Sequence, residues 1–420
     1  MRINKIVIGA LALLWAGMVG GQSINSPYSN NGVGELLFQG LPHNSGMGEV
    51  GIAMPTPWHI NLQNPSLLIN NTFSSFQVGL IGDFRRHENA TASDNANSAG
   101  LRFLAMSFPV VKNRWTSSFA LLPLSTVNYK TFSQNDQDLD VLEVTQFEGD
   151  GGLSNIAFSN AFRIYKSLSL GIKASYIFGT IDRRSRIQLI DEQLSNDYEI
   201  AYVEETSYSD YSLSFGLSYR HELKEDIYLN MGATYDPLNN LSGSEERLFE
   251  RWSLNGSVIQ VQPIDDGGEF LITLPESVGV GFSYEKLNNY SLGLDIKQFR
   301  WESANDESSG GVGFRNTVNV AMGAAWTPDY QNVNSYLKRA TYRFGISMKQ
   351  LPYLVNNTEI NDFGINFGAS FPVSGFSSMD AAFKYGFRGT TDNGLIRENY
   401  FQVIIGATIN DRWFIKRRYD

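Results

Sequence analysis

The chain has 420 residues, and its 33 lysines and arginines against 43 aspartates and glutamates give a formal net charge of −10 at pH 7. Such an acidic balance argues against nucleic acid as a partner, because phosphate recognition needs clustered basic side chains. The absence of cysteine excludes disulfides, thiolate metal sites and lipid attachment at an N-terminal cysteine.

The first 21 residues have the pattern of a secretory signal peptide. Arg2 and Lys5 precede an apolar stretch over Ile6–Val19, and Gly20 and Gly21 supply small residues for cleavage. The apolar stretch is shorter than the ~20 residues that a membrane-spanning helix requires. We therefore expect residues 1–21 to be a cleaved signal peptide and the mature chain to be exported.

Residues 22–72 show no alternation and are rich in glycine, asparagine, serine and proline. A stretch of about fifty residues is long for a plain loop in a compact fold. A wide β-barrel leaves an interior that wall side chains alone do not fill. We predict that residues 22–72 form a plug segment inside such a barrel, and that Asn64-Pro65 ends it, because proline biases the preceding residue away from helix.

From Phe73 to Ile409 a two-residue rhythm restarts about every 20 residues, as expected for strands whose side chains alternate between two faces. In Tyr211–Tyr219 large apolar residues occupy the odd positions, and serine or glycine lies between them. A soluble sandwich would present charged residues on its second face. An apolar face opposite a small, polar face instead predicts an all-β fold, a transmembrane antiparallel up-and-down β-barrel over residues 73–410.

Turn chemistry divides this region into fourteen predicted strands. They cover residues 73–87, 100–110, 115–132, 143–164, 168–188, 199–220, 226–247, 274–285, 290–303, 314–327, 337–350, 361–373, 377–389 and 396–410. Short connections alternate with long polar ones, of which residues 248–273 form the longest. An even count with short periplasmic turns places both termini in the periplasm.

Tryptophans near predicted strand ends, Trp115, Trp301 and Trp326, favour interfacial girdles. A barrel with this apolar surface would be in the outer membrane, in contact with membrane lipid and lipopolysaccharide. The basic end of the chain, residues 411–420 with Lys416, Arg417 and Arg418, would be a periplasmic tail.

Catalytic and metal-binding motifs are absent from the sequence. The four histidines have no metal-ligand spacing, and no Gly-x-Ser-x-Gly elbow occurs. Asp136, Asp138 and Asp140 imitate the start of a calcium loop, but Val141 replaces the glycine that such a loop requires. We expect a solvated acidic loop there, and we expect no catalytic residue, no metal and no cofactor.

Two stretches carry a resemblance to a known family. Met47-Gly-Glu-Val-Gly-Ile-Ala53, followed by Asn64-Pro-Ser-Leu-Leu68, resembles the start of FadL-type transporters of hydrophobic compounds, although Ser66 replaces the usual alanine. Ser26-Pro-Tyr28 and the basic tail resemble the relatives found in Bacteroidetes, including the PorV-type subunits of secretion systems. The resemblance covers essentially the whole mature chain and implies passive uptake through a plugged barrel.

The candidate functional residues all lie in the predicted plug. The gate candidates are Gly46, Gly48, Gly51, Asn64 and Pro65. The glycines tolerate the backbone angles that a reversible gate needs. A gating role for Asn64 and Pro65 is what the family resemblance implies. The ligand-pocket candidates are Leu36, Leu37, Phe38 and Leu41. They would line a pocket for hydrophobic small molecules or pack the plug against the wall. Two functions stay open: uptake of hydrophobic compounds, or a non-conducting subunit that docks to other outer-membrane proteins of a secretion or assembly complex.

Overall fold

The computed structural model describes residues 24–135, 141–191, 198–253, 255–304, 314–373 and 375–412. The predicted signal peptide, the acidic stretch over residues 136–140 and the basic residues 416–418 lie outside this part, so those predictions stay predictions. No described helix is long and apolar enough to cross a bilayer.

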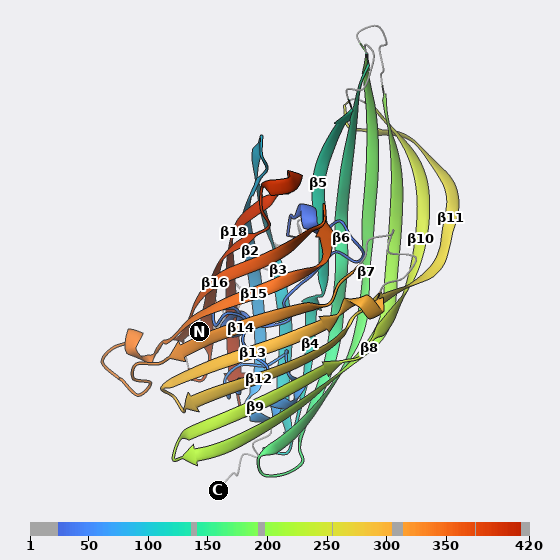
Figure 1. Cartoon of the computed structure of the whole chain (residues 1–420). Coiled ribbons are helices and arrows are strands. Elements are labelled where there is room, and N and C mark those ends of the chain that lie inside the picture. Colours follow the sequence, from blue (N-terminus) through green and yellow to red (C-terminus); the bar gives the residue numbers. More distant parts are fainter. Residues whose placement is uncertain are drawn as a thin grey trace, which may run out of the picture.

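The chain forms a closed antiparallel β-barrel (Figure 1). The strands of its wall are β2 (Ser74–Glu88), β3 (Ser93–Val111), β4 (Trp115–Pro123), β5 (Ser125–Asn135), β6 (Val141–Arg163), β7 (Leu168–Asp191), β8 (Tyr198–Lys224), β9 (Ile227–Asp236), β10 (Asn239–Ser253), β11 (Val258–Leu274), β12 (Glu276–Lys286), β13 (Tyr290–Arg300), β14 (Thr317–Trp326), β15 (Thr341–Val355), β16 (Thr358–Pro372), β17 (Ser378–Arg388) and β18 (Arg397–Asp411).

Neighbouring strands pair in sequence order, and the last strand closes the ring. The register of β18 with β2 runs from Asp411 opposite Ser74 to Arg397 opposite Glu88. Three wall strands are interrupted once each, so that β4 continues as β5, β9 as β10 and β11 as β12. In the described part of the chain the wall therefore has fourteen strands, and the predicted up-and-down barrel is confirmed.

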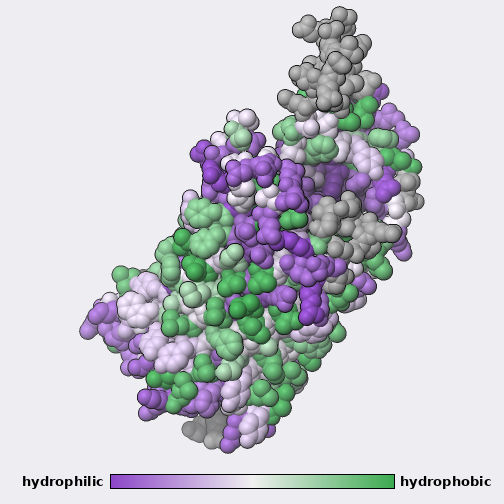
Figure 2. All heavy atoms as spheres, viewed as in Figure 1, coloured by the Kyte–Doolittle hydropathy of each residue, from purple (hydrophilic) through white to green (hydrophobic). Residues whose placement is uncertain are grey.

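Side-chain alternation matches the expected two faces of the wall. On β8 the odd-numbered residues from Tyr211 to Tyr219 are exposed on the outside, whereas Ser214 and Ser218 are buried on the inside. Apolar residues gather in a band over the lower barrel, and polar residues lie above it, on the face that Figure 2 shows. This is the surface of a membrane barrel, whose outside meets lipid while its lumen stays polar.

Aromatic side chains border the apolar band. Trp115 stacks on Phe162, and Trp326 packs against Tyr342, near the end of the barrel where β2 begins and the turns are short. The expected girdle position of Trp301 is wrong. This residue begins η3 (Trp301–Ala304), and its ring packs on Phe314 beside a cavity of the lumen, because β13 ends one residue earlier.

The long connection expected over residues 248–273 is wrong. Residues 248–253 extend β10, and β11 begins at Val258, so the two strands form a tall hairpin. The connection expected over residues 351–360 is likewise mostly strand, in β15 and β16. One side of the barrel is consequently much taller: β6, β7 and β8 have 23, 24 and 27 residues, whereas β13 and β14 have 11 and 10.

Residues 24–73, named here the N-terminal segment, lie within the barrel (Figure 1). The segment contains four short elements, η1 (Pro27–Ser29), β1 (Glu35–Leu36), α2 (Pro42–Ser45) and η2 (Pro65–Asn70). Two further short helices, η5 (Leu337–Arg339) and η6 (Asp392–Gly394), lie in connections between wall strands. Buried apolar residues of the segment, such as Leu41, Ile60 and Leu68, pack with Phe103 of β3 into one hydrophobic cluster. The core of the molecule therefore lies between the wall and this segment.

Candidate binding cavity in the lumen

The backbone of the N-terminal segment lies directly on glycines of the wall. A Cβ atom added to Gly46 would lie 2.7 Å from the Cα atom of Gly368 on β16. A Cβ atom added to Gly281 on β12 would lie 2.9 Å from the Cβ atom of Ile52. Glycine at these places permits a backbone-to-backbone approach that any larger side chain would prevent. The segment is therefore fitted to the wall.

Asn64 joins three parts of the structure. Its side-chain oxygen accepts hydrogen bonds from the backbone N–H and the hydroxyl of Ser66, at 3.1 and 2.7 Å, and so caps η2. Its side-chain nitrogen donates to the backbone oxygens of Ile52 and of Leu217 on β8, at 2.7 and 3.2 Å. Pro65 is buried beside Gly216 of the wall. Asn64 thus links the end of the segment to strand β8 of the wall.

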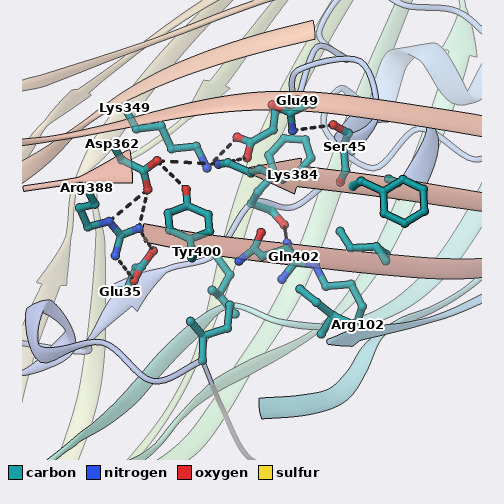
Figure 3. A pocket seen from close by; sticks show the side chains of 18 of the residues that line it. Glu35, Ser45, Glu49, Arg102, Lys349, Asp362, Lys384, Arg388, Tyr400 and Gln402 are labelled. Atoms are coloured by element: carbon teal, nitrogen blue, oxygen red, sulfur yellow. Dashed lines mark hydrogen bonds and ion pairs between the residues drawn. The ribbon is translucent and has the colours of Figure 1, made fainter. Parts of the chain in front are cut away.

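A buried network of charges ties the segment to the wall strands. The guanidinium of Arg388 on β17 lies 2.7 Å from the Glu35 carboxylate of the segment and 2.6 Å from Asp362 on β16. Glu49 of the segment lies 2.6 Å from Lys349 and 3.0 Å from Lys384. Figure 3 shows these side chains pointing toward one another in a small pocket.

The network continues on the far side of Arg388. Glu398 of β18 lies 3.4 Å from Arg388 and 2.7 Å from Arg85, and it accepts a hydrogen bond from the Ser26 hydroxyl at 2.5 Å. The Tyr400 hydroxyl donates to Asp362 at 2.6 Å. Replacing one member would leave its partners charged and buried, which typically costs about 3–5 kcal/mol, so the network tolerates no single neutral substitution without a loss of stability.

These contacts keep the acidic groups of the segment ionised. Burial alone would raise the pKa of the Glu49 carboxyl, but the ammonium groups of Lys349 and Lys384 outweigh it and hold this pKa below its ordinary value of 4.5. Burial would likewise raise the pKa of the Glu35 carboxyl, but the guanidinium of Arg388 outweighs burial, and the pKa of Glu35 is lowered. At neutral pH both carboxylates are therefore anchors for the segment.

A cavity of about 310 Å³ lies between the segment and the wall, with lining residues from both the tall strands β6–β8 and the shorter strands β13 and β14. Its apolar lining comes from the segment and the wall alike: the segment supplies Leu36, Leu37, Phe38, Ile52 and Leu62, and the wall supplies Ile177, Leu274, Phe299 and Leu351, with Trp301 of η3. Such a volume and such a lining suit a small, largely apolar molecule.

The same cavity has a polar corner. Asp236 of β9 is held by Lys297, at 2.9 Å, and by the hydroxyl of Ser277, at 2.6 Å. Lys173 of β7 also lines the cavity. Several buried polar atoms of the lining have no hydrogen-bond partner within the described part of the chain, namely Asn155 Oδ1, Thr234 Oγ1, Asn239 Nδ2, Asp295 Oδ1 and Asn319 Oδ1. A buried polar atom without a partner is costly, so these parts of the lining are suited to a polar group of a bound molecule or to water.

All three interruptions of the wall lie beside the cavity. The residues that line it there are Leu124, between β4 and β5, Pro237, between β9 and β10, and Pro275, between β11 and β12. The register of β8 passes from β10 at Ser209 to β9 at Phe215, and the intervening residues of β8 have no paired residue on that side. The hydrogen-bond ladder of the wall is thus broken where the cavity approaches it.

The structure brings together only some of the residues singled out from the sequence. Leu36, Leu37 and Phe38 line the cavity, whereas Leu41 is fully buried in the hydrophobic cluster under β3. The gate candidates contact the wall: Gly46 lies against Gly368, and Gly48 lies against the backbone of Met322 and Ile346. The N–H of Gly51 donates to Asp295 at 2.6 Å, Asn64 caps η2, and Pro65 is the first residue of η2.

Sequence reasoning missed the charged residues of the lumen. Lys384, Arg388 and Asp362 occupy inward positions of predicted strands, where charges in an otherwise small-residue face signalled a specific partner. Their partners could not be identified, because Glu49 and Lys384 are 335 residues apart in the chain.

Comparison with known proteins shows a matching family model and several solved structures with a similar barrel. A family model described as BamG matches residues 2–420. Among solved structures, the CymD monoaromatic hydrocarbon channel shares 15% identity at a TM-score of 0.57, covering 90% of this chain and 99% of that one. The Pseudomonas putida toluene transporter TodX shares 14% identity at a TM-score of 0.59, with coverages of 89% and 99%. A Pseudomonas aeruginosa FadL homologue shares 12% identity at a TM-score of 0.58, with coverages of 89% and 98%. No curated protein matches by sequence. The likeness shows a FadL-type barrel, as the resemblance implied.

Proposed function

Because the chain belongs to the BamG family and shares its fold with channels for hydrophobic compounds, we propose that it is an outer-membrane barrel that binds a hydrophobic small molecule and lets it cross passively. The cavity of about 310 Å³ carries this proposal, because its lining is apolar on both the segment side and the wall side. In this proposal the N-terminal segment is the plug, and Leu36, Leu37 and Phe38 contact the ligand.

The polar corner restricts the ligand further. Asp236 is already neutralised by Lys297, and Lys173 lies beside the same carboxylate. Two ammonium groups, those of Lys297 and Lys173, therefore face the single carboxylate of Asp236 at this corner, whereas the other acidic and basic residues of the lining lie elsewhere around the cavity. A molecule with an apolar body and an anionic or strongly polar head matches this lining, since its head would lie at Lys173 and its body along Leu37 and Phe299.

A pair of neighbouring residues tests the cavity. Ser175 on β7 points inward and lines the cavity, whereas Ala174 beside it is exposed on the outside. Tryptophan at Ser175 would fill the space, so Ser175→Trp should abolish binding of a fluorescent fatty acid and its uptake into liposomes that contain the purified protein. Ala174→Trp, which places the same ring in lipid, should behave as the wild type. Equal uptake by both variants would contradict a ligand in this cavity.

A second function is favoured by the buried network at Arg388. A segment held by Glu35 and Glu49 against β15 and β17 resists displacement, which suits a non-conducting subunit of a larger secretion or assembly complex. Gentle detergent extraction of the native protein separates the two. A subunit should migrate with other outer-membrane proteins and show no uptake, whereas a channel should migrate alone and carry lipid.

A further inference from the structure

Strand β11 has a partner on one edge only. Its residues pair with β10 from Leu274 opposite Asn239 to Val258 opposite Trp252. The strand that follows, β12, pairs instead with β9 and β13 near the short-turn end of the barrel. Within the part of the chain that the structure describes, the other edge of β11 has no paired strand, because β13 ends at Arg300 and β14 begins only at Thr317.

The opposite edge of the same tall sheet is covered. That edge is β5, where Glu35 and Leu36 of β1 pair with Thr126 and Ser125. The cover extends in both directions: the N–H of Leu37 donates to the Leu124 oxygen at 2.9 Å, and the N–H of Ser26 donates to the Asn128 oxygen at 2.8 Å. This sheet therefore already accepts an added extended segment at one of its two edges.

The upper part of β11 is apolar and exposed on both of its faces. All seven residues from Val258 to Ile264 are exposed, and four of them are Val258, Ile259, Val261 and Ile264, with exposed fractions of 43, 56, 51 and 43%. Soluble proteins protect such edges with charges, covering loops or short strands. Here Pro263 is the one protective residue in the stretch.

This stretch lies beyond the lipid-facing band. Leu271 pairs with Ser242, which in turn pairs with Ser209, just above the exposed ring of Tyr211. Ile264 lies seven residues further along the strand, which at about 3.4 Å per residue is a rise of about 24 Å along the strand. The stretch is therefore accessible from solvent, on the tall side of the barrel in Figure 1.

We propose that the free edge of β11 over Val258–Ile264 is a docking site for an extended strand of a partner polypeptide. The strand is added antiparallel, like every other pair in this wall, and main-chain hydrogen bonds to the edge supply its affinity. The strand offers apolar side chains on both of its faces, since Val258, Ile259, Val261 and Ile264 are exposed along the edge. The stretch of β10 behind this edge carries charges of both signs, at Glu250 and Arg251, so apolar contact and main-chain hydrogen bonds, rather than net charge, select the strand.

Pro263 identifies which amides point toward the partner. Proline has no N–H, so it is tolerated in a strand only where that group would face away from the neighbour. Pro263 lies opposite Leu248, and Val261, two residues earlier, lies opposite Glu250. By the two-residue period, the N–H of Val261 faces the free edge, so Val261→Pro removes a docking hydrogen bond and leaves the pairing with β10 intact.

Photocrosslinking in intact cells tests the proposal. A benzophenone amino acid at Val258 should form an adduct with another polypeptide, and the crosslinked residues should fall within one extended segment of it. Val261→Pro should lower the adduct yield about tenfold, the equivalent of one good interstrand hydrogen bond. The same photoreactive residue at Ser207, exposed on the central strand β8, should give no such adduct.

Folding of the variants is checked by the heat-dependent migration of the barrel in detergent. Should Val261→Pro fail to fold, Val261→Lys keeps the N–H and places a charge on the exposed edge, and it should lower the yield as well. Adducts only with a second copy of this chain, only with lipopolysaccharide, or none at all would overturn the proposal. A yield that is insensitive to both substitutions in folded barrels would overturn it too.

Discussion

At the scale of single residues, the wall is governed by which face a side chain occupies. On β8 Phe215 is 36% exposed among outward apolar residues, whereas its neighbour Ser214 is 7% exposed and faces the cavity. A substituted side chain at position 215 therefore faces outward, whereas the same side chain at position 214 faces the lumen.

Arginine at these two positions should affect assembly differently. Phe215→Arg places a charge in the lipid-facing band, which costs about 2–4 kcal/mol near the bilayer midplane, so the fraction of folded barrel should fall. Ser214→Arg points into the lumen near Asp236 and should be better tolerated. The measurement is the folded fraction after refolding into lipid vesicles, and equal losses for both variants would refute the register.

The attachment of the N-terminal segment should depend on pH through Glu49. Because the pKa of Glu49 is lowered in the folded state, its ion pairs stabilise the docked segment fully above its ordinary value of 4.5 and are lost as pH falls through the lower folded-state value. Hydrogen exchange of amides 44–54, corrected for the intrinsic effect of pH, should be faster at about pH 3 than at about pH 7. Glu49→Gln should weaken this dependence, and unchanged protection at the two pH values would count against the ion pairs as anchors.

At the scale of elements, the N-terminal segment and the wall fit each other through glycine. Gly368 on β16 and Gly46 of the segment approach so closely that a Cβ atom on Gly368 would lie 2.8 Å from the Cα atom of Gly46. Gly82 on β2 is a matched contrast, because a Cβ atom there meets only the ring of Phe84, at 3.6 and 3.8 Å.

Valine at these two glycines should separate wall stability from docking of the segment. Gly368→Val should displace the segment, so planar-bilayer conductance to small ions should rise and the segment should become sensitive to protease. Gly82→Val adds the same side chain to a strand with room for it and should remain closed. If Gly368→Val folds and stays non-conducting, the segment does not plug the lumen.

The wall strands were predictable from the sequence because the membrane imposes a simple rule on them. Strand β8 keeps its alternation only from Tyr211 to Tyr219, where one face meets lipid. Beyond the lipid band both faces of β11 are exposed over Val258–Ile264, and Leu248–Trp252 of β10 mixes apolar and charged residues without alternation. A strand in these surroundings shows no alternation of apolar and polar residues, so the sequence favoured a loop there.

The site was predictable only where the chemistry is local. The apolar run Leu36–Phe38 stood out in a polar stretch, and it lines the cavity. The polar corner was invisible, because Lys173, Asp236 and Lys297 come from three strands and meet only once the registers are fixed. Local sequence carries no information on such long-range neighbours.

At the scale of the whole molecule, the taller end and the short-turn end should face opposite sides of the membrane. Asn255 lies in the exposed connection between β10 and β11, and Asn288 lies in the short turn between β12 and β13. In the predicted orientation a cysteine at Asn255 reacts with an impermeant maleimide on intact cells, and one at Asn288 does so only after permeabilisation. The opposite pattern would reverse the side assignment.

The closing pair of the barrel sets an order of events during biogenesis. The ring is completed only when β18, the last strand, pairs with β2, the first, and residues 24–73 lie inside that ring. A segment with buried ion pairs to β15 and β17 and a hydrogen bond to Glu398 of β18 cannot form them before those strands exist, and it cannot easily thread in after the ring has closed. The start of the chain must therefore wait, unfolded, until the final strands arrive, and sealing of the wall then encloses it.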